Sequence, residues 1–183
     1  MARGLDGRVV IVTGATSGIG RATAILAAKE GARVAACGRN ELAGRELEEH
    51  VTRDGYVLKY YKCDVTDEAS VRAAVRNAAE DLGDIYGLVN NAGIELQPKP
   101  THEVTMEEWR RTLDTNLTGA FLCTKYAVPY MIKNRNGSIV YVSSISAIIG
   151  FDENPPYVAS KGALVALMKA EAVTYARYNI RVN

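Results

Sequence analysis

The sequence predicts a doubly wound α/β fold, in which a parallel sheet carries helices on both faces. Two observations lead to this prediction. Short β-branched runs alternate with helical segments along the whole chain, and a glycine-rich turn joins the first run to the first helical segment. Parallel strands need long right-handed crossovers, which helices supply. We expect residues 1–183 to form one domain.

The first half of the chain supplies four strands and three helices. In the first helical segment, Ile19, Ala22, Ile25 and Leu26 share one face, and Gly31 is placed to end the helix. The expected elements are strand 9–13, helix 19–30, strand 33–37, helix 41–53, strand 56–63, helix 68–82 and strand 85–90.

The second half continues the alternation after a loop that contains two prolines. Gly119 and Pro129 are weak points of a long helical region, 105–133. A strand over 138–143, a helix over 157–178 and the start of a strand over 180–183 follow. Because ligands of such sheets bind at the carboxyl ends of the strands, motifs at those ends are the first candidates for function.

Composition and charge exclude several classes of protein. Lys and Arg total 22 and Asp and Glu total 21, in mixed order, which argues against a nucleic-acid or acidic-membrane partner. No apolar run approaches the ~18 residues of a membrane span, and no leader pattern begins the chain, so we expect a cytoplasmic protein. Cys37, Cys63, Cys123, His50 and His102 lack metal-ligand spacing, and we expect no metal site.

The turn after the first strand reads TGATSGIG and predicts a dinucleotide site. Gly14 permits the tight turn, Gly18 lets a phosphate approach the backbone, and Gly20 lets the helix pack close to the sheet. The free N–H groups of the first helical turn, at Ser17 to Ile19, face an anion. The alternative is a glycine turn that only connects a strand to a helix.

The end of the second strand favours NADP over NAD. Cys37, Gly38, Arg39 and Asn40 offer no carboxylate for the ribose hydroxyls of NAD, whereas the guanidinium of Arg39 suits a 2′-phosphate. Glu41 is close enough in sequence to keep NAD possible. Arg39 could also be an ordinary solvated turn residue.

Tyr157 and Lys161 lie one helical turn apart, at the start of the last long helix. A phenol has a reference pKa near 10, and an ammonium one turn away favours the phenolate and lowers that pKa. Tyr157 is therefore a candidate general acid and base. Taken alone, the pair is also compatible with an ordinary amphipathic helix start.

Five motifs in order give the chain a resemblance to the short-chain dehydrogenase/reductase family, from Gly7 to Asn183. The resemblance implies a Rossmann-type sheet and a nicotinamide cofactor. It also implies that the chain stops before a loop with a Pro-Gly pair, a substrate helix and a last strand. The motifs are the glycine turn, Asn90–Gly93, Asn116 within Asp114–Gly119, the Ser143–Ser144 pair, and Tyr157 with Lys161.

The resemblance assigns catalytic roles to four residues. Ser144 matches the serine that hydrogen-bonds the substrate oxygen, and Tyr157 matches the proton donor or acceptor. Lys161 matches the lysine that assists the tyrosine and binds the nicotinamide ribose. Asn116 matches the residue thought to hold a water molecule in the proton relay.

Cofactor contacts follow from the same resemblance. Asp64 and Val65 match a pair that contacts adenine, whereas Asn91, Ala92 and Gly93 match the lining of the cofactor's ribose. Together with the glycine turn, Arg39, Tyr157 and Lys161, these residues complete the expected cofactor site.

Other residues near the site receive weaker interpretations. We expect the hydroxyls of Ser143 and Ser146 to form local bonds with the backbone. The residues expected to rim the substrate pocket are Glu95, Leu96, Gln97, Ile145, Phe151, Asp152, Glu153 and Asn154. Their mixture selects no substrate, although the acidic members disfavour a highly anionic one.

The leading hypothesis is an oxidoreductase that transfers hydride between NADP(H), or NAD(H), and a ketone or secondary alcohol, a small-molecule substrate. A catalytically silent dinucleotide-binding module is the main alternative. An epimerase or dehydratase is weaker, because such enzymes need a longer substrate domain. The resemblance also implies a homo-oligomer, dimer or tetramer, formed through the helices over 114–133 and 157–178.

Overall fold

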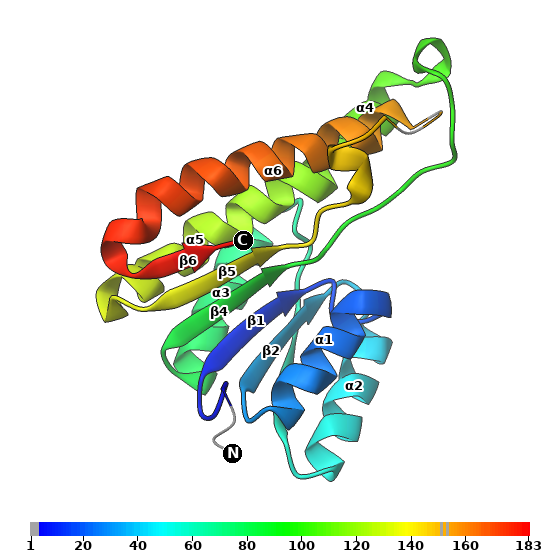
Figure 1. The fold of residues 1–183 in the computed structure, drawn as a ribbon. Coiled ribbons are helices and arrows are strands. Elements are labelled where there is room, and N and C mark those ends of the chain that lie inside the picture. The colour runs from blue at the N-terminus through cyan, green and yellow to red at the C-terminus, as the bar shows by residue number, and fades with distance from the viewer. Residues whose placement is uncertain (1–3, 151, 153) are drawn as a thin grey trace.

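The computed structural model describes residues 4–150, 152 and 154–183 and contains one six-stranded parallel sheet (Figure 1). Its order is β3-β2-β1-β4-β5-β6, so the direction of winding reverses between β1 and β4. This arrangement confirms the predicted doubly wound fold. The strands are β1 (Val9–Thr13), β2 (Arg33–Gly38), β3 (Val57–Lys62), β4 (Ile85–Asn90), β5 (Gly137–Tyr141) and β6 (Ile180–Val182).

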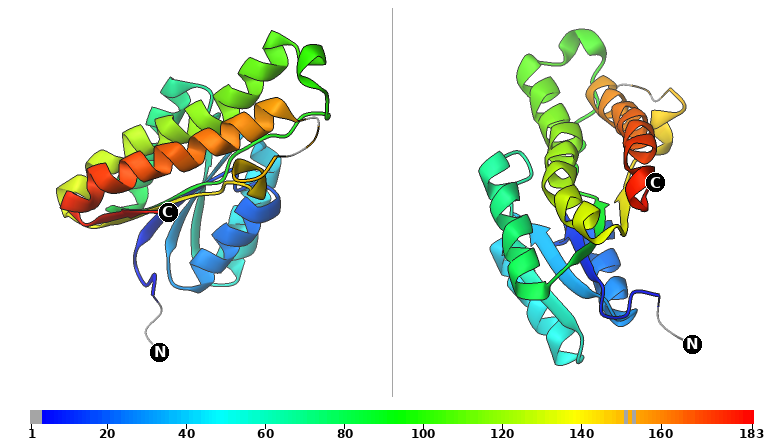
Figure 2. Two further views of the ribbon diagram at one scale, coloured as in Figure 1. Left: turned by 45° about the horizontal axis from the view of Figure 1, so that its top comes forward. Right: turned by 90° about the vertical axis from the view of Figure 1, so that its left-hand side faces the viewer.

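Helices cover both faces of the sheet (Figure 2). Helices α1 and α2 pack on one face, and α3, α5 and α6 pack on the other. The helices are α1 (Gly18–Lys29), α2 (Glu41–Arg53), α3 (Glu68–Leu82), α4 (Met106–Leu113), α5 (Gly119–Asn134) and α6 (Pro155–Tyr175).

Alternation along the central strand explains the two layers. In β1, Val9 and Ile11 face the core beneath α3 and α5, whereas Val10 and Val12 face the core beneath α1 and α2. All four side chains are buried, which is typical of a parallel strand covered on both sides.

Local capping fixes the starts of several helices. The side chain of Asn40 accepts from the amide of Ala43 at the start of α2. At the start of α4, Thr105 and Glu108 form a reciprocal capping box. These polar caps set where each crossover begins and thereby where the preceding loop ends.

Three predicted elements differ from the structure by more than one residue at an end or in the type of helix. The strand over 138–143 ends at Tyr141, so the following serines lie in a loop. The helix over 157–178 already begins at Pro155, because proline is favoured in a first helical turn, and its last three residues are a 3₁₀ turn. The region 105–133 contains a π-helical turn, Asp114–Thr118, whereas Pro129 lies inside α5 without ending it.

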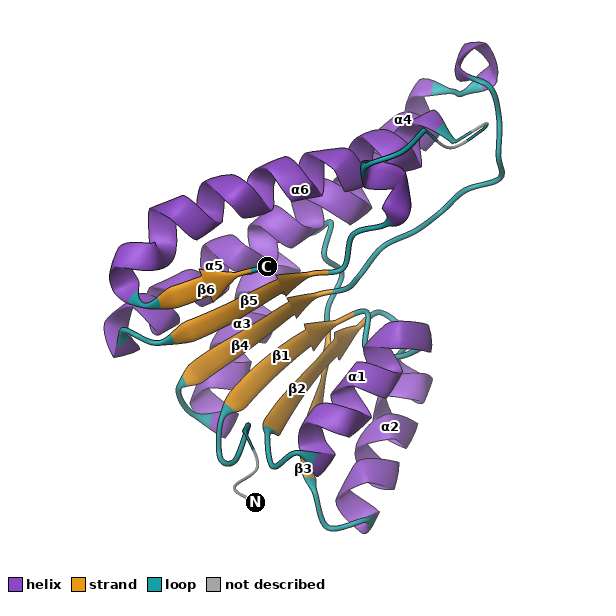
Figure 3. Cartoon of the chain, viewed as in Figure 1, coloured by secondary structure: helices purple, strands orange, loops and turns teal. Residues whose placement is uncertain are grey.

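The loops after β1, β2 and β4 gather at one end of the sheet, where the strands point (Figure 3). This is the end at which the sequence places its motifs. None of the helices in the described part of the chain combines the length and apolar character that crossing a bilayer requires.

Candidate active site

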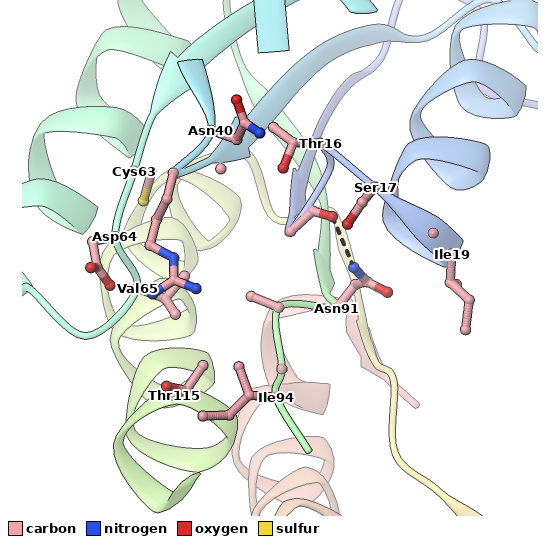
Figure 4. A pocket seen from close by; sticks show the side chains of 16 residues that line it. Thr16, Ser17, Ile19, Asn40, Cys63, Asp64, Val65, Asn91, Ile94 and Thr115 are labelled. Carbon is pink, nitrogen blue, oxygen red and sulfur yellow. Dashed lines mark hydrogen bonds between the residues drawn. The ribbon is translucent and has the colours of Figure 1, made fainter. Parts of the chain in front are cut away.

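A cavity of about 540 Å³ opens at the carboxyl ends of β1, β2, β3 and β4 (Figure 4). Asp64 and Val65 lie across it from Ser17 and Ile19, and Asn91 lies between them. The cavity therefore lies at the reversal in strand order, where doubly wound sheets bind their ligands.

The glycine turn forms one wall of this cavity. Gly14 has a φ of 64° and Gly18 a φ of 51°, a region that glycine adopts without steric cost. Ser17 precedes α1 and forms no side-chain cap, so its hydroxyl does not occupy the first amides of the helix. Those amides and the positive end of the helix can receive a phosphate.

Gly20 lies behind the turn, outside the lining of the cavity. A Cβ at this position would overlap the carbonyl of Gly14 and the side-chain amide of Asn91. The same amide donates to the carbonyls of Thr13 and Gly14, at 2.9 and 3.4 Å. Gly20 thus allows the turn to close against the loop after β4.

The far wall carries one cation and one carboxylate among its described residues, Arg39 and Asp64. Burial disfavours the charged form of Asp64, but the amide and hydroxyl of Thr66 donate to its Oδ1 and lower its pKa overall. Glu41 is absent from this lining. Its carboxylate contacts Arg45 at 2.7 Å and Lys62 at 3.6 Å instead.

Gly93 joins the cavity to the residues predicted to be catalytic. A Cβ at Gly93 would lie 3.3 Å from Oδ1 of Asn116 and 3.5 Å from Nζ of Lys161. Gly93 itself lines the cavity, so both buried polar groups lie next to a lining residue, although neither is in the lining. Lys161 and Tyr157 are not themselves in the lining.

Asn116 lies in the π-helical turn and is 1% exposed. Its Oδ1 accepts from the amide of Ile94 at 2.7 Å, and its Nδ2 donates to the carbonyl of Ile94 at 2.9 Å. The same Nδ2 donates to Oγ of Ser160 at 3.0 Å. This side chain therefore fixes the loop after β4 against α6.

Lys161 is buried beside Tyr157 in the first turns of α6. Its Nζ donates to the carbonyl of Val142 at 2.7 Å and lies 5.6 Å from the centroid of the Tyr157 ring. Burial lowers the pKa of Lys161. The backbone bond holds the ammonium close to the aromatic ring.

The loop after β5 presents three serines. Ser143 donates to the backbone carbonyl of Lys161 at 3.1 Å, a backbone bond that is not local. The expectation for Ser146 is wrong, because its hydroxyl donates to Oγ of Ser144 at 2.9 Å rather than to the backbone. The two hydroxyls meet because Ser144 caps a single 3₁₀ turn that contains Ser146.

The structure brings most of the predicted residues around one cavity, and it adds others that the sequence analysis missed. Thr115 and Ile94 reach the lining through the π turn and the loop after β4, which no local pattern revealed. Phe151 and Glu153 lie outside the described residues. The predicted residues in the lining are Gly14, Ser17, Gly18, Ile19, Arg39, Asp64, Val65, Asn91, Ala92 and Gly93, and those missed are Thr16, Gly38, Asn40, Cys63, Ile94 and Thr115.

Comparison with known proteins identifies the class. Residues 8–183 match the family model described as short chain dehydrogenase. The 2,5-dichloro-2,5-cyclohexadiene-1,4-diol dehydrogenase of Sphingobium indicum is 39% identical over 180 residues, which are 98% of this chain and 71% of that protein.

Two solved structures share the fold closely. An NAD⁺-bound xylitol dehydrogenase has a TM-score of 0.95 and 37% identity, covering 98% of this chain and 69% of that one. A gluconate 5-dehydrogenase from Burkholderia cenocepacia, in complex with NADP and tartrate, has a TM-score of 0.94 and 32% identity, covering 100% and 71%. The chain belongs to the short-chain dehydrogenase family, a family of oxidoreductases.

Proposed function

We propose that this chain transfers hydride between NADP(H) and a ketone or secondary alcohol, with Tyr157 as general acid and base. The observation that carries the proposal is the junction at Gly93, where the cavity meets Asn116 and Lys161. A dinucleotide lying in the cavity would have its reactive end beside the groups that can handle a proton. We propose that residues 1–183 work as one domain in this reaction.

The cavity suits a dinucleotide by its shape and its donors. The glycine turn leaves room for a pyrophosphate, and the uncapped start of α1 offers amides and a positive dipole. The bound nicotinamide supplies or accepts the hydride. The hydride passes between the cofactor and a carbon atom of the substrate, so the residues of this chain position the reactants and transfer the proton.

Residues of this chain would then act on the substrate oxygen. Tyr157 and Ser144 donate hydrogen bonds where negative charge develops on that oxygen during reduction, and Tyr157 gives up its proton. The Lys161 ammonium, 5.6 Å from the ring centroid, stabilises negative charge on the phenolate. Asn116 fixes Ile94 and α6, and its part in a proton relay stays a prediction.

We propose NADP as the preferred cofactor. Arg39 lines the cavity beside the end of β2, and Glu41, which could accept from the ribose of NAD, is paired with Arg45 and Lys62. The related structures hold NAD⁺ in one case and NADP in the other, so family membership alone does not decide the cofactor. The proposed preference for NADP therefore rests on Arg39 and Glu41 of this chain.

The substrate class is a small secondary alcohol or its ketone. The names of the similar proteins include a cyclic diol, a neutral sugar alcohol and a sugar acid. All three are hydroxylated compounds, and they differ in charge. We also propose symmetric self-association through α5 and α6, where Phe121 and Val173 are exposed, which light scattering tests.

The decisive experiment follows NADPH absorbance with a panel of ketones and secondary alcohols. Tyr157→Phe should lower kcat by about 10²-fold or more, because a positioned general acid contributes that much, while NADPH affinity measured by fluorescence is retained. Tyr126→Phe is the matched control, since its hydroxyl contacts Glu68 on α3. Wild-type binding of NADPH without any turnover would favour the silent module instead.

A further inference from the structure

Two loops are joined beside the first turn of α6. Nδ2 of Asn154 donates to Oε1 of Glu95 at 2.7 Å. Asn154 is 6% exposed and lies three residues before Tyr157. Glu95 follows Ile94, whose backbone is held by Asn116. The bond therefore places a carboxylate between the loop that Asn116 holds and the start of the helix that carries Tyr157 and Lys161.

The space next to this bond is open. A cavity of about 470 Å³ is lined in part by Asn154, Asp152 and Thr101. A much smaller hollow, lined in part by Asn154, Lys99 and Glu108, adjoins the other side of the same asparagine. Glu95 itself is exposed, so its carboxylate is accessible to a molecule that enters between the loops.

We call these two hollows together the entrance. Its charged lining residues are Lys99, Glu108 and Asp152, so its net charge is negative. Among the described residues that line the two hollows, Lys99 is the one cation, and its ammonium pairs with Glu108 at 2.5 Å. Within residues 4–150, 152 and 154–183, neither Glu95 nor Asp152 has a cation at salt-bridge distance. An anion entering the larger hollow meets the carboxylate of Asp152, which lines it, and lies near Glu95, which is bonded to the lining residue Asn154. No cation of the described chain neutralises either carboxylate.

We infer that Glu95, oriented by Asn154, makes this site select neutral polyhydroxylated alcohols over carboxylates; the inference rests on the proposed function and narrows its substrate class. One carboxylate oxygen of Glu95 accepts from Asn154, and the other has no donor among the described residues, so it can accept from a second hydroxyl of the substrate. Such a charge-assisted bond favours a diol or sugar alcohol. A substrate carboxylate at the same place is repelled.

The experiment compares xylitol with xylonate, which have the same number of carbon atoms and differ in charge. Dissociation constants are measured by ligand-observed NMR with NADP⁺ present, and kcat/KM is measured in parallel. Wild type should prefer xylitol in both measurements. Glu95→Gln should reduce the preference for xylitol over xylonate by about tenfold. The main cause should be tighter binding of xylonate, because a like charge is removed.

Glu46→Gln is the matched control, since it removes the same charge from the exposed face of α2. It should leave the preference unchanged. Salt should weaken the wild-type preference and have little effect on the Glu95→Gln preference. The inference is overturned if wild type binds both ligands equally, or if Glu95→Gln keeps the wild-type ratio. If binding follows Glu95 but wild type oxidises neither these ligands nor any alcohol of the panel, the proposed function fails and the binding preference stands.

Discussion

The Ser146 hydroxyl donates to Oγ of Ser144 at 2.9 Å, and the Ser146 amide donates to the same oxygen at 3.2 Å. A hydroxyl has two acceptor positions and one hydrogen to donate. Ser146 therefore occupies both acceptor positions of Ser144. The hydroxyl hydrogen of Ser144 is left to point elsewhere, which is the arrangement needed to donate to a substrate oxygen.

The first prediction is that Ser146→Ala lowers kcat by about fivefold, because Ser144 loses the bond that orients its hydroxyl, a loss of roughly 1 kcal/mol. KM and the affinity for NADPH should change little. Ser146→Thr keeps the hydroxyl and should restore most of the loss. Steady-state kinetics with a saturating ketone measure the effect.

A double-mutant cycle distinguishes whether Ser146 orients the Ser144 hydroxyl or only stabilises the loop. If Ser146 acts through Ser144, then adding Ser146→Ala to Ser144→Ala should have almost no further effect on kcat. An equal loss in both backgrounds would mean that Ser146 only supports the loop. A Ser144→Ala variant with full activity would contradict the proposed role of Ser144 itself.

The second prediction concerns the cofactor. Arg39→Ala should weaken NADPH binding by about 30-fold and leave NADH binding almost unchanged, because a charge-assisted bond to a phosphate is worth about 2 kcal/mol. Fluorescence titration of both cofactors measures the effect. Arg53→Ala removes an equal charge at the end of α2 and is the control. Equal losses for both cofactors would show that Arg39 does not distinguish them.

The sequence was most informative where local signals agree. The bounds of β1, α2, α3 and β4 match the prediction, since each has a clear periodic run and a polar or glycine boundary. The motifs that directly follow β1, β2 and β4 also line one cavity, because the carboxyl ends of parallel strands share an edge.

The parts that sequence reasoning missed depend on contacts between distant segments. Asn116 holds Ile94 and Ser160, which are 22 and 44 residues away, so no local pattern could reveal the clamp. The π turn around Asn116 was expected as ordinary helix, because a single extra residue per turn leaves no compositional trace. Asn154 and Glu95, 59 residues apart, are a similar case.

The third prediction is that Gly20→Ala disrupts both the fold and the cofactor site. The added methyl group would overlap the Gly14 carbonyl and the Asn91 amide, and neither can move without opening the turn. We expect a loss of about 2 kcal/mol in unfolding free energy, and NADPH affinity at least tenfold weaker. Urea unfolding and fluorescence titration check these values. Ala22→Gly, on the same helix, should cost helix stability without an equal loss of affinity.

The fourth prediction concerns a buried polar chain that links β4 to α6. The Asn90 amide donates to Thr124, the Thr124 and Tyr141 hydroxyls lie 2.6 Å apart, and Tyr141 donates to Glu171 at 2.5 Å. Glu171 is 8% exposed. Its burial raises its pKa, and the bond from Tyr141 only partly opposes this effect.

The raised pKa of Glu171 in the folded state determines the direction in which stability changes with pH. The folded protein binds the Glu171 proton more tightly than the unfolded chain does. The protonated carboxyl therefore makes its full contribution to the free energy of unfolding below the ordinary carboxyl pKa, and this contribution is lost as pH rises through the raised pKa of the folded state. Glu171→Gln cannot ionise and keeps an acceptor for Tyr141. It should match wild type below about pH 4 and exceed it at pH 8 by about 1 kcal/mol, or about 3 °C in Tm. Thermal melts across this range, with Glu49→Gln on α2 as control, measure the difference; a constant offset at every pH would contradict the assignment.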